Sequence, residues 1–169
     1  IVKTNKLLVV LSGPEPQRSI FEKLILEQLK DLKEFTVLVR GLPLEESVLP
    51  KCQNLVVHNY LASHDLSIAI QQADLVLARA GYSTIMDLAT LAQKAILVPT
   101  PGQAEQEYLA AYLKKQGFFY TCGQGNFNLK KALLEAESFY KKDPPSPVGL
   151  NIDVIKNWLE ELKRSMALQ

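Results

Sequence analysis

Residues 73–111, ADLVLARAGYSTIMDLATLAQKAILVPTPGQAEQEYLAA, contain two short apolar strands that each run into a polar loop and an amphipathic helix. We place the strands at Leu75–Ala78 and Ala95–Val98, followed by turns at Arg79–Ser83 and Pro99–Gly102. Continuous aliphatic runs are typical of parallel strands that are buried on both faces, with helices as the crossovers. Because ligands of open α/β sheets bind beyond the carboxyl ends of the strands, both turns are predicted to lie at the functional edge.

The same alternation of strand and helix extends over the rest of the sequence. Further strands are predicted at Lys6–Leu11, Phe35–Val39, Asn54–His58 and Phe118–Thr121. Helices are predicted at Pro16–Lys30, Asp65–Gln72, Thr84–Ala92, Gln103–Gln116, Leu129–Tyr140 and Asn151–Leu162, with residues 143–150 as a proline-containing linker. This succession predicts an α/β fold: a Rossmann-like, doubly wound parallel sheet of about six strands with helices on both faces.

Three helix ends carry recognisable sequence signals. Thr84, with Asp87 three residues later, approximates a capping box. Pro16 fits a first-turn position, because its missing N–H would have no partner there. Gly117 is a normal residue for the position just past a helix end.

Charge and cysteine content narrow the class of protein. The 169 residues carry 19 Lys and Arg against 18 Asp and Glu, so nucleic acid is not an expected partner. No apolar run approaches the ~20 residues of a membrane span. Cys52 and Cys122 lack metal-ligand spacing, and we expect reduced thiols in a cytoplasmic protein. Because the first residue is Ile1 rather than Met, we expect a longer natural chain.

The first strand–helix turn, Ser12-Gly13-Pro14-Glu15-Pro16, has two interpretations. It contains one glycine, so the GxGxxG dinucleotide fingerprint is absent. A helix start after such a turn can hold phosphate through its N–H groups and its dipole. The same residues also suit a plain turn that begins a helix, and both interpretations stay open.

A second helix start follows the turn Arg79-Ala80-Gly81-Tyr82-Ser83-Thr84. Gly81 allows a close backbone approach or a positive φ. Ser83, Thr84 and the N–H groups after them line this helix start, either as caps or as ligand-binding groups. Asp87 either complements the helix dipole or accepts both hydrogen bonds of a ribose diol.

A third polar helix start contains Gln103, Gln106 and Glu107. Amides and carboxylates suit hydrogen bonds to sugar hydroxyls, and they also suit a solvated first turn. His58 and His64 have no metal-ligand partners at suitable spacing, so surface or cap roles are expected. Neither a GxSxG elbow nor an Asp-x-Asp pair occurs, and a metal-bound diphosphate is therefore not predicted.

Taken together, these residues resemble the donor-binding signature of family twenty-eight glycosyltransferases of the GT-B type, the family of lipid II GlcNAc transferases. The family pattern is roughly Ala-Asp, an apolar stretch, Arg-[Ser/Ala]-Gly, Thr and an acidic residue, followed by a strand and a loop leading to Gln-[Gln/Glu]. This sequence keeps Ala73, Asp74, Arg79, Gly81, Thr84, Pro99, Gln106, Glu107 and Ala110 in register. The specific match covers residues 73–111, and the strand–helix succession extends it over most of the chain.

The resemblance implies a role for each turn. The residues from Gly81 through Tyr82 and Ser83 to Thr84 would support the diphosphate of a nucleotide sugar, and Asp87 would hold its ribose. The other implied donor-site residues are Ser12 and Gly13 at the phosphate loop, Tyr60 and Leu61 at the uracil turn, Arg79, Gln103, and Gln106 and Glu107 at the sugar.

The sequence departs from the family pattern at four places. Asp87 stands where the family usually has Glu, and the turn at residues 12–16 is not glycine-rich. Residues 92–94 (Ala-Gln-Lys) replace the common Gly-x-Pro, and Leu109 replaces an asparagine near the sugar. Uridine diphosphate is still the nucleotide that the resemblance implies.

The resemblance covers the C-terminal half of such enzymes. Residues 1–169 would then form one nucleotide-sugar-binding domain, with a final helix at 151–166 that crosses back to an N-terminal acceptor domain. That domain, or a partner subunit, would bind a lipid or glycan acceptor and supply the catalytic base, so no catalytic residue is assigned here. The implied mechanism uses a UDP sugar as co-substrate and needs neither a metal nor a further cofactor. We expect a cytoplasmic location, with peripheral membrane contact through the other half.

Two other functions stay open. Hydrolases and epimerases that act on UDP sugars share this architecture and donor site. A non-catalytic subunit could also supply the donor site to a membrane-bound partner. The acceptor half would distinguish these functions from a transferase.

Overall fold

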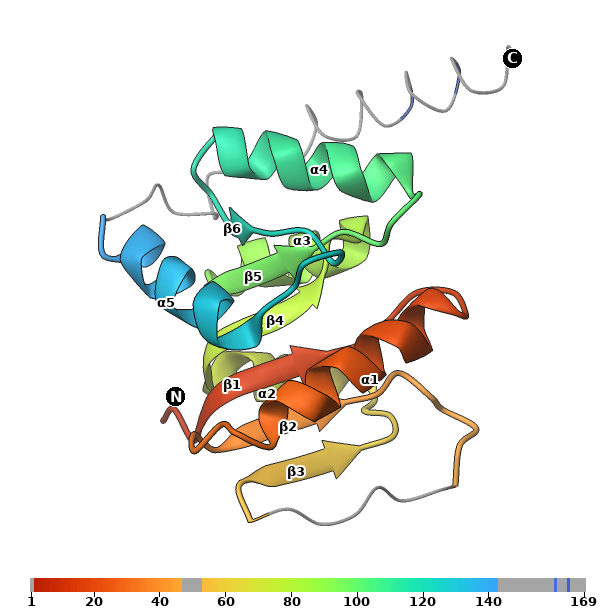
Figure 1. Ribbon diagram of the computed structural model, residues 1–169, viewed down its shortest axis with the longest axis vertical. Coiled ribbons are helices and arrows are strands. Elements are labelled where there is room, and N and C mark those ends of the chain that lie inside the picture. The colour runs from red at the N-terminus through yellow and green to blue at the C-terminus, as the bar shows by residue number, and fades with distance from the viewer. Residues whose placement is uncertain (1, 47–52, 143–159, 161–163, 165–169) are drawn as a thin grey trace.

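The computed structural model describes residues 2–46, 53–142, 160 and 164. The predicted linker at 143–150, Cys52 and nearly all of the predicted helix at 151–166 lie outside these residues. The described part of the chain folds as one parallel sheet between two layers of helices (Figure 1).

Six strands form the sheet within the described residues. They are β1 (Asn5–Val10), β2 (Thr36–Val39), β3 (Leu55–His58), β4 (Ala73–Arg79), β5 (Ala95–Val98) and β6 (Tyr120–Thr121). Their order is β3-β2-β1-β4-β5-β6, and all neighbouring strands are parallel. This order confirms the predicted doubly wound, Rossmann-like architecture.

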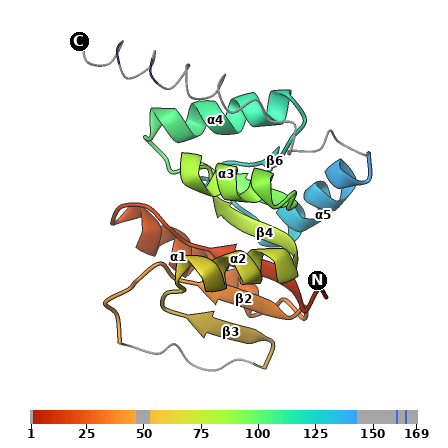
Figure 2. The same ribbon diagram turned by 180° about the vertical axis from the view of Figure 1, so that it is seen from behind.

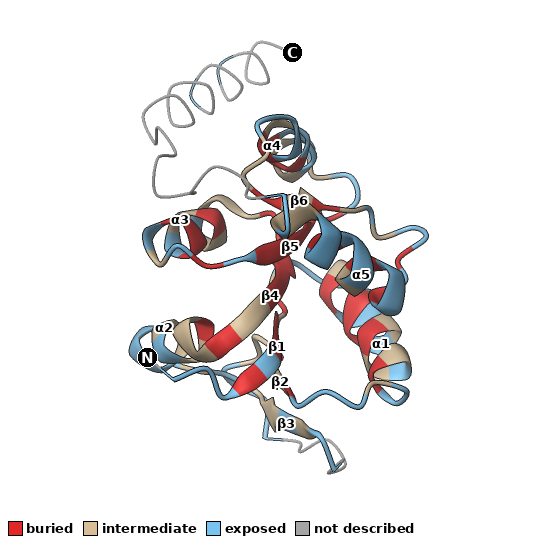
Figure 3. Cartoon of the chain, turned by 90° about the vertical axis from the view of Figure 1, so that its left-hand side faces the viewer, coloured by how far each residue is buried: buried red, intermediate tan, exposed pale blue. Residues whose placement is uncertain are grey.

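The described helices lie on both faces of the sheet. They are α1 (Gln17–Leu29), α2 (Ser63–Gln72), α3 (Tyr82–Thr90), α4 (Ala104–Lys115) and α5 (Leu129–Tyr140). Helices α1 and α5 cover one face, α2 and α3 cover the other, and α4 lies along the β6 end (Figures 1 and 2). This arrangement buries the central strands on both sides, as Figure 3 shows.

Strand residues alternate between two apolar clusters. Leu7 and Val9 of β1 pack in the same cluster as Phe21 of α1. Leu8, which points to the opposite face, packs in the cluster that contains Ile85 of α3. Burial of each such side chain contributes roughly 1.5–3 kcal/mol, and these clusters therefore hold the helices against the sheet.

Strand β6 is shorter than the predicted Phe118–Thr121 because the end of α4 uses the backbone that would begin it. Gly117, at φ +77°, donates its N–H to the carbonyl of Lys114, and Phe118 donates to Leu113. These two bonds form a Schellman motif, which confirms Gly117 as the residue past the helix end. The N–H of Phe118 is then no longer available to the sheet.

Helix α3 begins two residues before the predicted start at Thr84. Gly81 is the N-cap residue, no side chain caps the helix, and the carbonyl of Gly81 accepts from Ile85 at 3.0 Å. The capping box predicted for Thr84 and Asp87 is therefore wrong, because both residues lie inside the helix. Pro16 also differs by one position, since it is the N-cap residue of α1 and not its first helical residue.

Candidate functional site

The loops that follow the strands meet at one edge of the sheet and form the candidate site. Strand order reverses between β1 and β4, which lie side by side and lead to opposite ends of the sheet. Ligands of doubly wound sheets bind at this switch point. It lies between the β1–α1 turn at residues 11–16 and the β4–α3 turn at residues 80–81.

Arg79, the last residue of β4, lies beneath the switch point. Its surface is only 1% exposed, and its guanidinium lies 4.2 Å from the ring centre of Phe21. It donates hydrogen bonds to the carbonyls of Gln17, at 3.1 Å, and Pro99, at 3.4 Å. Burial lowers the pKa of Arg79 to about 10, so the group is still charged at neutral pH. Arg79 therefore joins α1 to the loop after β5 and places a positive charge below the edge without reaching the surface.

The N–H groups at the start of α1 are bonded to groups of the preceding turn. The N–H of Ser19 donates to the carboxylate of Glu15 at 3.1 Å, and the guanidinium of Arg18 donates to the same carboxylate at 2.6 Å. The N–H groups of Arg18 and Ile20 donate to backbone carbonyls of the turn. An internal carboxylate thus takes the place where this helix start would hold phosphate. The geometry favours the plain-turn interpretation of residues 12–16.

Ser12 and Gly13 lie in this turn, next to the loop after β5. Ser12 is half-buried and Gly13 is exposed at φ +102°, a conformation that suits glycine. A Cβ atom on Gly13 would lie 3.6 Å from Oγ1 of Thr100. That oxygen is enclosed and has no hydrogen-bond partner among the described residues. The turn and the loop after β5 are therefore neighbours.

The start of α3 is open, in contrast to that of α1. Helix α3 has no side-chain cap, so the N–H groups of Tyr82, Ser83 and Thr84 have no partner within the helix. Ser83 is exposed, and Gly81 has a negative φ of −77° with no atom closer than 4.0 Å to its Cβ position. Gly81 does not adopt the positive φ that the sequence allowed. Because glycine has no side chain, Gly81 leaves the approach to these N–H groups clear.

Asp87 lies in the second turn of α3, exposed, and lines a pocket of about 300 Å³ between α2 and α3. Ser63, the first residue of α2, lines the same pocket. Tyr60 and Leu61 come directly before α2; Tyr60 is 54% exposed, and Leu61 packs on the core. The pocket lies between α2 and the second half of α3, and Ser63 joins it to the β3–α2 turn.

The β5–α4 loop is held by side chains from the helix that follows it. Gln106 accepts from the N–H of Thr100 at 2.9 Å and donates to the side chain of Gln103 at 2.5 Å. Glu107 accepts from the N–H of Gly102 at 3.0 Å. In this structure these polar groups shape the loop, and Gln103, as the N-cap residue of α4, is half-buried.

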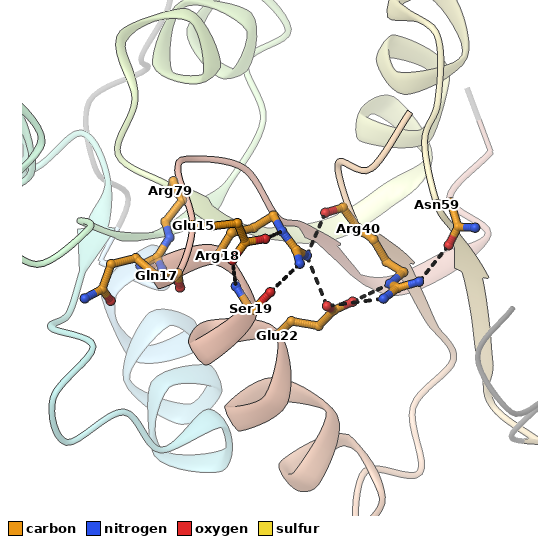
Figure 4. Close-up of polar contacts among 8 residues, drawn as sticks. All are labelled: Glu15, Gln17, Arg18, Ser19, Glu22, Arg40, Asn59 and Arg79. Carbon is orange, nitrogen blue, oxygen red and sulfur yellow. Dashed lines mark hydrogen bonds and ion pairs between the residues drawn. The ribbon is translucent and has the colours of Figure 1, made fainter. Parts of the chain in front are cut away.

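A buried ion network that was not predicted from the sequence joins α1 to the ends of β2 and β3 (Figure 4). Glu22 of α1 pairs with Arg18 at 3.0 Å and with Arg40, which follows β2. Arg40 also donates to Oδ1 of Asn59 at 2.9 Å. The signal was present: Arg18 and Glu22 are four residues apart on the face of α1 that also presents Ile25 to the core.

Two further properties belong to the described residues as a whole. Within residues 2–46 and 53–142 no group of three or more His, Cys, Asp and Glu side chains is arranged to hold a metal ion. No described helix is both long and apolar enough to span a bilayer.

Cys122 is a free thiol, and burial raises its pKa to about 11.

Known glycosyltransferases resemble this chain in sequence. An N-acetylglucosamine transferase of Caldanaerobacter subterraneus, named as acting on N-acetylmuramyl-(pentapeptide) pyrophosphoryl-undecaprenol with UDP-N-acetylglucosamine, is 27% identical over 150 residues. The match covers 83% of this chain and 41% of that enzyme, so the chain spans well under half the length of this relative.

Two solved structures share the fold. The glycotransferase of kitacinnamycin superposes with a TM-score of 0.62 at 18% identity, over 83% of this chain and 38% of that one. The solution structure of ALG13 superposes with a TM-score of 0.59 at 14% identity, over 80% of this chain and 87% of that one.

The sequence pattern of the glycosyltransferase family 28 C-terminal domain matches residues 7–145. This range takes in β2 to β6, the last four residues of β1 and the loops at the switch point. The chain therefore belongs to glycosyltransferase family 28, as the C-terminal domain of that family.

Proposed function

We propose that this domain binds a UDP sugar and serves as the donor-binding part of a glycosyltransferase. The observation that carries the proposal is the open start of α3 at the switch point. Three N–H groups without helical partners, together with the helix dipole, suit the diphosphate of the donor. The neighbouring helix start of α1 is occupied by Glu15, so α3 is the favoured place for the anion.

The positions of the other candidate residues support one orientation of the nucleotide. Tyr60 and Leu61 would contact the base, and Asp87 would hold the ribose from the pocket that also contains Ser63. Asp87 is five residues after Tyr82, which corresponds to ~8 Å along the helix. The ribose would then lie between the base turn and the diphosphate.

The sugar would lie toward the β5–α4 loop. Gln103, Gln106 and Glu107 would contact its hydroxyls, which requires Gln106 and Glu107 to exchange or share their bonds to the loop N–H groups. Ser12 and Gly13 would border the diphosphate on the β1 side, next to the enclosed Thr100.

The buried charge of Arg79 supports binding without a metal. No carboxylate among the described residues forms an ion pair with its guanidinium, so its field is available to an anion above the edge. Together with the N–H groups of α3, this charge would stabilise the departing diphosphate during transfer of the sugar. The acceptor and the catalytic base would come from another domain or subunit.

Calorimetry of the 169-residue chain tests this proposal. We expect weak UDP binding, weaker GDP and dTDP binding, and the same UDP affinity with magnesium or with EDTA. UMP should bind more weakly than UDP, because it lacks the second phosphate. A chain that binds none of these nucleotides, or that binds UDP only with magnesium, would contradict the proposal.

A donor-site subunit is a second candidate. The fold of ALG13, a chain of similar extent, supports the idea that such a domain can exist as a separate protein. Purification of the native protein with a membrane-bound partner would favour this candidate. Release of free sugar from a UDP sugar without an acceptor would instead favour a hydrolase, and conversion of the sugar an epimerase.

A further inference from the structure

The ion network of Glu22, Arg18 and Arg40 is buried next to the candidate site (Figure 4). The side chains of Arg18, Glu22 and Arg40 are 7%, 9% and 10% exposed. Arg40 donates to Glu22 through Nε and, at 3.4 Å, through Nη2. Its remaining nitrogen, Nη1, donates to Asn59. One planar guanidinium therefore connects helix α1 to the end of strand β3.

Asn59 is the first residue after β3 and directly precedes Tyr60. Its side chain accepts from Arg40 through Oδ1 and donates through Nδ2 to the carbonyl of Glu45 at 2.7 Å. Its own carbonyl accepts from the N–H of Leu42 at 2.7 Å. Three bonds thus determine the path of the chain as it enters the turn at residues 59–62.

The backbone after β2 is also held against the β1–α1 turn. Gly41 has φ +70°, and a Cβ atom there would lie 2.4 Å from the carbonyl oxygen of Leu11. Arg18 donates to the carbonyl of Arg40 at 3.3 Å. The chain ends of β1, β2 and β3 are therefore joined through Arg40 and its neighbours.

Burial of three ions is an expensive way to hold a fold together, because apolar side chains of similar size are often equally stabilising. A guanidinium differs from an apolar side chain in that it binds two partners at defined angles and so fixes their relative positions. We propose that Arg40 is a positioning residue that acts through Asn59 and holds the turn at Tyr60 and Leu61 in the conformation that receives the nucleotide base. This inference rests on the function proposed above and adds a determinant of base binding to it.

A double-mutant cycle between Arg40 and Asn59 tests the inference. Arg40→Lys keeps the charge opposite Glu22 and loses the planar fork, and Asn59→Ala removes the acceptor. Calorimetry on the 169-residue chain would use UMP, which carries a base, and inorganic pyrophosphate, which does not. We expect Arg40→Lys to weaken UMP binding about fivefold, as for loss of one hydrogen bond, and Asn59→Ala to weaken it further, because the bond to Glu45 is lost as well. The double variant should lose less than the product of the two single losses, because both changes remove the Arg40–Asn59 bond. Pyrophosphate binding should stay within about twofold.

Two further variants separate positioning from general loss of structure. Asn59→Asp keeps an oxygen acceptor for Arg40 and loses the Nδ2 donor to Glu45, so it should bind UMP more tightly than Asn59→Ala. Asn54→Ala is the matched control: Asn54 stands at the opposite end of β3, and its side chain donates to the carbonyl of Lys33 at 2.9 Å. It removes a similar bond far from the site and should leave UMP binding unchanged.

The outcomes are distinguishable. Wild-type chain that binds no uridine nucleotide would overturn the proposed function and this inference with it. If the wild type binds UMP and the Arg40 and Asn59 variants bind it equally well, only the positioning role is overturned. Equal losses for UMP and pyrophosphate, or fully additive effects in the double variant, would also overturn it.

Discussion

Ala92 ends helix α3 in a backbone conformation that favours glycine. Its φ is +50°, its N–H donates to the carbonyl of Ala89, and the N–H of Gln93 donates to Leu88. This is the same Schellman motif that Gly117 completes at the end of α4. The sequence departs from the family pattern here, since Ala92 replaces a glycine.

Ala92→Gly should therefore stabilise the domain by about 1 kcal/mol, because a non-glycine residue in this region is strained by roughly that amount. Ala92 is exposed, so the change loses no packing. Thermal unfolding should shift upward by about 2–4 °C. Gly117→Ala is the matched change in the opposite direction and should lower the midpoint. A lower midpoint for Ala92→Gly would show that the Cβ atom is needed.

Asp87 is the residue that we assign to the ribose. Asp87→Ala should weaken binding of UDP and UMP about tenfold, as for a charged acceptor of two hydrogen bonds, and should leave inorganic pyrophosphate nearly unaffected. Calorimetry with the three ligands measures the difference. Asp74→Ala is a control carboxylate, since Asp74 pairs with Lys6 at the far end of β1 and β4. Equal losses for all three ligands would argue against the ribose role.

At the scale of elements, Arg79 joins β4, α1 and the loop after β5. Arg79→Lys keeps the charge but cannot reach the carbonyls of Gln17 and Pro99 in the same way, and Arg79→Gln loses the charge as well. Both variants should unfold at lower temperature, because buried carbonyls lose their donors. Only Arg79→Gln should lose most of its pyrophosphate affinity. Equal pyrophosphate affinities for the two variants would show that the charge does not act on the anion.

The Glu15 carboxyl at the start of α1 makes the stability of the fold depend on pH. Hydrogen bonds from Ser19 and from Arg18 lower the pKa of Glu15 below its usual 4.5. A carboxyl group with a lowered folded pKa stabilises the fold above the unfolded pKa and loses that contribution as the pH falls through the folded value. Between pH 5 and pH 3 the wild type should therefore lose more stability than Glu15→Gln. Urea unfolding at both pH values measures this, and parallel losses would contradict it.

At the scale of the whole molecule, a ligand that binds only the folded domain must stabilise it. UDP at one hundred times its dissociation constant should add about 2.7 kcal/mol to the free energy of unfolding. The unfolding midpoint should rise by several degrees, at about 2–4 °C per kcal/mol. Because we propose binding without a metal, the rise should be the same in EDTA. A shift that depends on magnesium would contradict that part of the proposal.

The amino-acid sequence by itself determined the architecture. Aliphatic runs such as Ala95–Val98 predict strands buried on both faces, and their alternation with amphipathic segments leaves few ways to order a parallel sheet. The sequence also indicated where the loops would lie, because parallel strands all end at one edge. Local backbone detail was less predictable: Thr84 could have capped α3, but the helix starts earlier, at Tyr82.

Only the tertiary structure decided which of three similar helix starts is open. Each follows a strand and a polar turn in the sequence, yet Glu15 fills the start of α1, and Gln106 and Glu107 hold the loop before α4. The structure also shows that Leu109, which replaces a family asparagine, is buried in the core. Arg79 and Arg40 likewise acquire their partners from segments distant in the chain. The contacts of Arg79 and Arg40 depend on how side chains from separate strand ends converge, and local sequence patterns carry no information about that convergence.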